Sequence, residues 1–231
     1  MATQPGLIAK SRAPLSRERV LRAALVLADE GGIESLTMRR LGQALQVEAM
    51  SLYNHIAGKD DILDGIVDLV FSEIVVPSDI AGWKTAMRQR AISARDALTR
   101  HPWATSLMQS RTKPGPATLR HHDAVIGSLR EAGFTIDMAA HAFSVMDGYI
   151  YGFALQQVNL PSHTSEESAA LADSILRELP AEKYPHLAEM IVEHALKPGD
   201  DYADEFAFGL DLILDGLEGL RGVPNRRRQR A

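Results

Sequence analysis

The side chains that offer the clearest chemistry in this sequence lie close together, between Leu36 and Lys59. They combine cations, hydroxyls, a phenol, an amide and an imidazole with two small or apolar groups. The set is Arg39, Arg40, Ala49, Met50, Ser51, Tyr53, Asn54, His55 and Lys59. Cations and hydroxyls can hold phosphate oxygens, while amide, hydroxyl and methyl groups can contact base edges or thymine methyls in a major groove. This segment therefore offers the chemistry of DNA recognition.

Two short helices must position these groups. Leu41 and Leu45 lie one turn apart in one predicted helix, and Leu52 and Ile56 lie one turn apart in the next. Each pair is too small to form a core alone, so the two helices must bury their pairs against each other and against a first helix capped at Ser16. This packing is helix-turn-helix geometry, and it turns the polar groups of the last helix outward. Periodicity alone fits a small three-helix bundle with a solvated polar face equally well.

Helical periodicity continues along the rest of the chain, and no run of alternating β-branched residues occurs. The fold class is all-α: a three-helix head with a helix-turn-helix, followed by a larger helical region. Beyond Pro77 the predicted helices span 82–100, 102–110, 116–132, 135–160, 165–179, 185–196 and 202–221. The expected organisation is a disordered arm over 1–15, a DNA-binding head over 16–60, a ligand-binding and dimerisation domain over 61–221 and a basic disordered tail over 222–231.

Composition narrows the possible functions. The 231 residues contain no cysteine, which excludes disulfides, thiolate metal sites and cysteine nucleophiles and favours a cytoplasmic protein. The formal charge of −5 is uneven: residues 1–60 carry +2, residues 61–220 carry −12 and the last eleven carry +5. A mildly basic head on an acidic body suits a DNA partner better than the whole-chain sum suggests. No apolar run is long enough to suggest a membrane span.

The head resembles the DNA-binding domain of the TetR family of bacterial repressors. The matching residues are Ala23-Ala24, Gly31-Gly32, Leu36-Thr37, Arg39, Leu41-Gly42, Val47, Leu52-Tyr53-Asn54-His55 and Lys59. The resemblance continues through Trp83, Ala132-Gly133-Phe134 and the segment from Phe206 to Glu218, so it covers roughly residues 16–220. The C-terminal part resembles the ligand domain of the tetracycline repressor.

The resemblance implies a homodimeric repressor in which each head reads one half of a palindromic operator. The residues implied to meet bases are Arg39, Ala49, Met50 and Ser51, and those implied to hold phosphates are Thr37, Tyr53, His55 and Lys59. Asn54 could do either. The chain departs from the family at Gln46, where glycine is usual. A positive φ at Gln46 would cost on the order of 1 kcal/mol in strain.

Two helices from each subunit are implied to form the dimer interface, here 135–160 and 202–221. Their apolar stripes are wider than one small core needs, although each residue could also belong to an internal core. The predicted interface residues are Phe143, Ile150, Phe153, Leu210, Ile213, Leu214 and Leu217. Gly148 and Gly152 would allow two helices to approach closely.

A pocket for a small apolar effector is implied between the helices from Trp83 to Tyr151. Aromatic and methionine side chains with a few polar groups suit such a ligand. The predicted lining is Trp83, Met87, Arg90, Trp103, Met108, His122, Phe143, Met146, Asp147 and Gln156. Tetracycline-binding members use a histidine and a partner glutamate where this chain has Met108 and Gln156, which are poor ligands for a hard divalent cation. The effector is therefore expected to need no metal and not to be tetracycline, and no cofactor is expected.

Two other functions compete with this interpretation. A helical-bundle enzyme with a di-metal carboxylate site would show Glu-x-x-His, and no histidine here has Glu three residues before it. Phosphate-binding and hydrolase motifs are missing as well. The other alternative is a helical dimer that binds small molecules but not DNA. The head retains Arg39, Tyr53, His55 and Lys59, which argues against this alternative.

Overall fold

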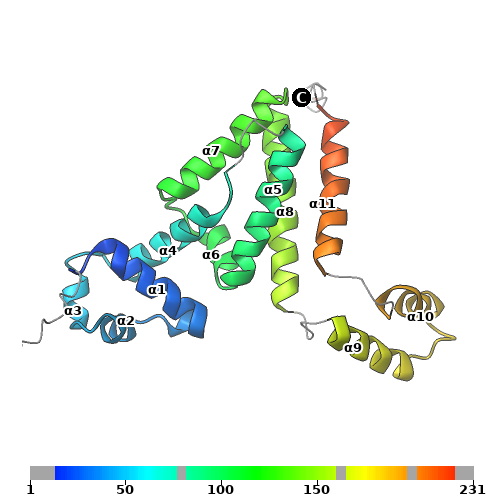
Figure 1. Ribbon diagram of the computed structural model, residues 1–231, viewed down its shortest axis with the longest axis horizontal. Coiled ribbons are helices and arrows are strands. Elements are labelled where there is room, and N and C mark those ends of the chain that lie inside the picture. Colours follow the sequence, from blue (N-terminus) through cyan, green and yellow to red (C-terminus); the bar gives the residue numbers. More distant parts are fainter. Residues whose placement is uncertain (1–13, 77–81, 160–164, 197–201, 222–231) are drawn as a thin grey trace, which may run out of the picture. The chain divides into compact units, whose positions relative to one another are not determined.

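The computed structural model describes residues 14–76, 82–159, 165–196 and 202–221, and every regular element within these ranges is a helix. This confirms the predicted all-α class. The chain divides into two compact units, Met1–Ile66 and Val67–Ala231, whose helices are labelled in Figure 1. The predicted tail over 222–231 and all but the last two residues of the predicted arm over 1–15 lie outside the described residues.

The first unit is built around α1. Its elements are α1 (Arg17–Gly31), the 3-10 turn η1 (Ile33–Ser35), α2 (Met38–Leu45), α3 (Ala49–Leu52) and the beginning of α4 (Lys59–Glu73). Ser16 caps α1 as predicted, because its hydroxyl accepts from the backbone N–H of Arg19 at 3.3 Å. Val20, Ala24 and Ala28 recur at helical spacing on the buried face of α1 and supply the core against which α2 packs.

The third helix is shorter than the sequence suggests. α-Helical structure covers Ala49–Leu52 instead of reaching Ile56. Beyond Leu52 the backbone forms i→i−3 hydrogen bonds: Tyr53 to Met50 at 3.3 Å and His55 to Leu52 at 2.9 Å. The last turn is thus tightened, as is common at helix ends. The tighter turn still buries Ile56, which is 4% exposed.

The second unit contains the remaining helices. They are α5 (Trp83–Arg100), α6 (Ala104–Ser110), α7 (Pro116–Glu131), α8 (Ile136–Val158), α9 (Ser165–Glu178), α10 (Pro185–Met190), the π-helical turn η3 (Ile191–Ala195) and α11 (Tyr202–Glu218). α5 and α8 lie side by side, and α11 packs against both (Figure 1). Alanines at buried positions of α5 and α8, such as Ala91 and Ala142, let the two backbones approach closely. Within the described ranges, no helix has the length and apolar character needed to cross a bilayer.

The C-terminal half of α4 is fastened to the start of α7. Gly115, the residue before α7, has no side chain to cap the helix, and the carboxylate of Asp68 takes that role. It accepts from Thr118 N at 2.8 Å, Thr118 Oγ1 at 2.9 Å and Ala117 N at 3.2 Å. A carboxylate at this position also suits the positive end of the helix dipole. A Cβ at Gly115 would lie 2.3 Å from this carboxyl group, so glycine makes the close approach possible.

Part of the predicted dimer surface was wrong. Four of its residues are already buried within their own subunit, at 6% exposure or less: Ile150, Leu210, Leu214 and Leu217. The wide apolar stripe of α11 divides in two, because positions two apart are separated by about 200° around a helix. Leu210 therefore faces α5 and α8, whereas Leu212 is 60% exposed. Phe143, Phe153 and Ile213 are half-buried.

Candidate functional site

The turn between α2 and α3 fixes the spacing of the side chains predicted to contact DNA. Gln46 ends α2 in the left-handed conformation, with φ 58° and ψ 45°, and is the one non-glycine residue with positive φ in the described part of the chain. Gly42 permits the tight turn, since a Cβ there would lie 2.9 Å from the Val47 carbonyl oxygen and 3.2 Å from Ala49 N. The turn is thus compact, and Gln46 has the positive φ for which strain is predicted.

The side chains predicted to contact DNA stay accessible on this framework. Leu52, at 0% exposure, anchors α3 in the core. Met50 is 75% exposed and Tyr53 is 48% exposed, although both are large and apolar in part. Of the other predicted contacts, Thr37, Arg39, Asn54 and Lys59 are exposed, and Ala49, Ser51 and His55 are half-buried. None of the predicted contacts is taken up by the core, which is the first requirement of a recognition surface.

Some cations of the head have hydrogen-bond or ion-pair partners among the described residues, and others do not. Arg17 pairs with Asp61 at 2.7 Å, and Asp61 also accepts from Ala57 N at 2.9 Å, so this pair holds the two ends of the head together. Arg40 donates to the Ser35 carbonyl oxygen at 3.3 Å. By contrast, Arg39 and Lys59 make no hydrogen bond or ion pair with any part of the chain that the structure describes. These two charges are therefore available to phosphates. Thr37 caps α2 by accepting from Arg40 N at 3.2 Å.

A buried polar cluster lies between α5, α7 and α8 in the second unit. Arg90, 1% exposed, forms an ion pair with Asp147 through Nη2 and donates from Nε to Nε2 of His121 at 3.1 Å. Tyr151 donates its hydroxyl to the second oxygen of Asp147 at 3.3 Å. We call Arg90, His121, Asp147 and Tyr151 the polar cluster. A buried ion pair such as Arg90–Asp147 is stable only when further hydrogen bonds engage its polar atoms, as His121 and Tyr151 do here.

Burial controls protonation in the polar cluster. Burial first, and then the charges of Arg90 and His122, lower the pKa of His121 to about 3, so this imidazole is neutral near pH 7. Burial and the nearby Asp147 carboxylate raise the pKa of Tyr151, which therefore keeps its proton. Burial also lowers the pKa of His122, although Asp147 opposes that shift.

The structure brings together only part of the predicted ligand lining. Arg90 and Asp147 meet directly, the Arg90 guanidinium lies 5.8 Å from the centre of the Phe143 ring, and Phe143 packs edge-to-face on His122 at 5.2 Å. Met87 and Met146 are fully buried. Trp83 instead donates to Glu218 at 2.8 Å and packs on Phe134, while Trp103 packs on His101. Met108 is half-buried and Gln156 is exposed.

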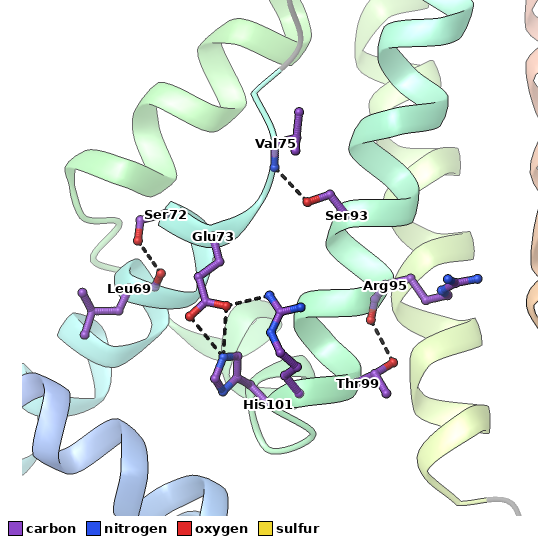
Figure 2. A network of polar contacts seen from close by, with 9 residues as sticks. Leu69, Ser72, Glu73, Val75, Ser93, Arg95, Thr99 and His101 are labelled. Atoms are coloured by element: carbon purple, nitrogen blue, oxygen red, sulfur yellow. Dashed lines mark hydrogen bonds and ion pairs between the residues drawn. The ribbon is translucent and has the colours of Figure 1, made fainter. Parts of the chain in front are cut away.

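A second polar network joins the end of α4 to α5 (Figure 2). Glu73 accepts from Arg100 at 2.7 Å and contacts His101 Nε2 at 3.2 Å. Burial alone would raise the pKa of Glu73, but the hydrogen bond from Arg100 and the charge of His101 lower it. Ser93 accepts from the backbone N–H of Val75 at 3.0 Å. The network contains none of the predicted site residues and fastens the end of α4 to α5.

Comparisons with known proteins agree with both units. The family model "Bacterial regulatory proteins, tetR family" matches residues 20–66, and "Tetracyclin repressor-like, C-terminal domain" matches residues 76–221. The repressor DrrR1 of Streptomyces coeruleorubidus is 34% identical over 96% of this chain and 84% of its own length. This chain belongs to the TetR family. It is accordingly a DNA-binding, ligand-responsive transcriptional regulator, and its relatives are transcription factors rather than enzymes.

Other TetR-family relatives extend the comparison. The class D tetracycline repressor of Escherichia coli is 30% identical over 89% of this chain and 90% of its own length. The structure of ActR from Streptomyces coelicolor in complex with actinorhodin is 27% identical to this chain. The matched region covers 91% of this chain and 100% of the ActR chain, with a TM-score of 0.76. Similarity over both units shows that the whole described chain has the TetR-family architecture.

Sequence reasoning missed two members of the polar cluster in the second unit of this TetR-family protein. His121 and Tyr151 belong to the polar cluster, yet neither was among the predicted lining residues. Tyr151 lies four residues after Asp147, and this helical i, i+4 spacing could have indicated the contact. Nothing local indicates His121, because it meets Arg90 across 31 residues of sequence. Within the described ranges, no group of three or more His, Cys, Asp or Glu side chains has the geometry of a metal site.

Proposed function

We propose that this TetR-family protein is a repressor that binds a palindromic operator as a homodimer and is released when a small molecule binds its helical unit. The observation that carries the proposal is the helix-turn-helix surface, where Arg39 and Lys59 are exposed and unpaired among the described residues. Its target is the chromosome, so we place it in the cytoplasm. The DNA-binding head and the helical ligand unit are proposed to follow the two compact units.

Roles within the head are proposed from the family resemblance. Thr37, Tyr53, His55 and Lys59 are proposed to hold phosphates. Arg39, Ala49, Met50 and Ser51 are proposed to meet bases, and Asn54 can do either. Phosphate contacts contribute to every sequence alike and weaken with salt, whereas base contacts discriminate between sequences. The two groups are therefore separable by experiment.

The test is a fluorescence-anisotropy titration of the protein with DNA from its own promoter at several salt concentrations. Lys59→Ala should weaken binding and lower the slope of log K against log salt by about 1, because one phosphate contact is lost. Arg22→Ala is the matched control, since Arg22 is an exposed cation of α1 already paired with Glu18 at 2.7 Å. Equal losses in both variants, or no salt-sensitive binding by the wild type, would contradict the proposal.

The dimer is proposed to form through exposed apolar side chains of α8 and α11. These side chains are Val145, Leu155, Phe208 and Leu212, each at least 51% exposed. On α8 they flank Gly148 and Gly152, where a Cβ would meet nothing within 4 Å, so a second helix can approach closely. Helices from two subunits that bury such stripes would form a four-helix bundle.

Light scattering after gel filtration tests the interface. Phe208→Glu should halve the measured mass, since burying the new carboxylate against a second copy is costly. Leu119→Glu is the control, because Leu119 is 56% exposed on α7, a helix that is not part of the proposed interface. Monomeric wild-type protein would rule out the homodimer, and a dimeric Phe208→Glu variant would rule out this interface.

The effector is proposed to bind without a metal ion and not to be tetracycline. Met108 is half-buried and Gln156 is exposed, and neither side chain suits a hard divalent cation. Calorimetry with magnesium and tetracycline should therefore show no binding heat. Tight binding of the chelated drug would contradict this assignment.

A further inference from the structure

A cavity of about 460 Å³ lies beside the second polar network, between α5 and the chain that follows α4. Figure 2 shows two residues of its lining, Val75 and Ser93, next to each other. Asp96, also in the lining, comes six residues after Arg90, so the two side chains point about 120° apart around α5. None of the residues predicted to line the effector pocket lines this cavity. It is therefore a separate site, and its volume is sufficient for a small organic molecule.

Two opposite charges lie one helical turn apart in the lining of this cavity. Asp96 and Arg100 are at i, i+4 spacing, at which a carboxylate and a guanidinium can pair directly. Each of them has another partner instead. Arg95 donates to one oxygen of Asp96 through Nε at 3.1 Å and Nη2 at 2.8 Å, and Arg100 donates through Nη2 to Glu73 at 2.7 Å. The two charges therefore remain separate on the same side of α5.

Both charges keep atoms that a ligand can use. Oδ2 of Asp96 has no hydrogen-bond partner among the described residues, and neither have Nε and Nη1 of Arg100. The side chains are 47% and 54% exposed, so a ligand can reach them. Glu73 differs, because Arg100 and His101 engage both of its oxygens. The cavity thus offers an acceptor and a donor group, one helical turn apart.

Apolar side chains complete the lining. Val75 is 48% exposed and Ile92 is half-buried, and both line the same cavity. Covering these side chains would remove apolar surface from water, which favours binding. A simple inorganic ion would leave them uncovered. The lining therefore suits a molecule that carries two opposite charges and an apolar group.

We propose that this cavity binds an α-amino acid with a large apolar side chain. The ammonium group donates to Asp96, the carboxylate accepts from Arg100, and the apolar side chain packs on Val75 and Ile92. An amino acid carries its two charges on one carbon atom, and this short separation suits two residues on successive turns of one helix. The proposal goes beyond the proposed function, because it adds a binding site outside the proposed effector pocket.

Three compounds test this proposal with the full chain and without DNA. L-Phenylalanine carries both charges, 3-phenylpropanoate lacks the ammonium group, and phenethylamine lacks the carboxylate. Dissociation constants are measured by ligand-observed NMR titration. The wild type should bind phenylalanine about fivefold more tightly than either analogue, since an exposed ion pair contributes modestly.

Two variants assign each charge of the ligand to one side chain. Asp96→Asn should abolish the preference for phenylalanine over 3-phenylpropanoate and keep the preference over phenethylamine. Arg100→Gln should have the reverse effect, because it removes the partner of the carboxylate. Asp123→Asn is the matched control and should keep both preferences, since Asp123 is an exposed carboxylate of α7 outside the cavity.

Thermal unfolding shows whether each variant folds, and Asp96→Asn alone decides if Arg100→Gln does not. Absence of phenylalanine binding, or an analogue that binds as tightly as phenylalanine, overturns the proposal. Both preferences surviving in Asp96→Asn would also overturn it, because the ammonium group would then bind elsewhere. Promoter binding is not part of this experiment, so failure of the repressor proposal would leave its result unchanged.

Discussion

The two units of this protein keep their functional groups in opposite settings. The groups predicted to contact DNA lie in one stretch of the head's sequence, between Thr37 and Lys59, and remain accessible. The polar cluster of the helical unit is buried, and its central contacts from Arg90 span 31 and 57 residues. An exposed group depends mainly on its own helix, whereas a buried group depends on every helix that surrounds it. The head should therefore tolerate polar substitutions that the helical unit does not.

Substituting one arginine in each unit, Arg90 and Arg39, should give the largest difference in stability. Arg90→Met should destabilise the protein by about 3–5 kcal/mol, because it leaves the Asp147 carboxylate buried and unpaired. Arg39→Met should change the free energy of unfolding by only about 0.5 kcal/mol, since Arg39 is exposed and unpaired among the described residues. Urea unfolding followed by circular dichroism measures both.

A compensating substitution checks the reason for this difference. Adding Asp147→Leu to Arg90→Met should recover most of the lost stability, because no charge is then left unpaired. If the double variant is as unstable as the single one, lost packing rather than the unpaired charge explains the effect. If Arg39→Met costs as much as Arg90→Met, the contrast between the two units fails.

Lowering the pH should reduce the free energy of unfolding of the helical unit, because His121 is buried in its neutral form. Its folded pKa of about 3 lies well below the ordinary value of 6.5, so below pH 6.5 the unfolded chain takes up a proton that the folded chain does not. Above pH 6.5 the ring is neutral in both states and contributes no pH dependence. Stability should therefore fall as pH drops from 6.5 towards 3, by up to about 1.4 kcal/mol per pH unit from this residue.

His121→Gln isolates this effect. Glutamine keeps a carbonyl oxygen that can accept from Arg90 but does not titrate, and the other histidines are the same in both proteins. Unfolding free energies measured between pH 7 and pH 4 should converge as the pH falls, because only the wild type loses this stabilisation. Parallel curves would mean that His121 is protonated in the folded state.

The smallest expected effect lies in the head, at Gln46. Gln46→Gly should stabilise the protein by up to about 1 kcal/mol, because glycine adopts φ 58° without strain. Gln43→Gly is the matched control: Gln43 is exposed inside α2, where glycine costs about 1 kcal/mol relative to a good helix former. The two substitutions should thus have opposite signs in thermal unfolding. A loss at Gln46 would show that its conformation is not strained.

Local patterns predicted the elements of both units well. Ser16 caps α1 as predicted, because a cap needs only the few residues next to it. The errors lie where distant packing decides. The third helix tightens after Leu52, and half of the apolar stripe on α11 faces its own subunit. A stripe in sequence shows that a face is apolar, but not which neighbour covers it.

The sequence by itself determined the all-α class and the family, and it predicted which exposed groups of the head contact DNA. These follow from helical spacing, caps and a continuous motif, all of which act over short distances along the chain. Tertiary structure alone decided that Arg90 meets His121 and Asp147, and that one of its nitrogens has no acceptor among the described residues. Hydrogen bonds between helices depend on their orientation in space, and no local pattern encodes that orientation.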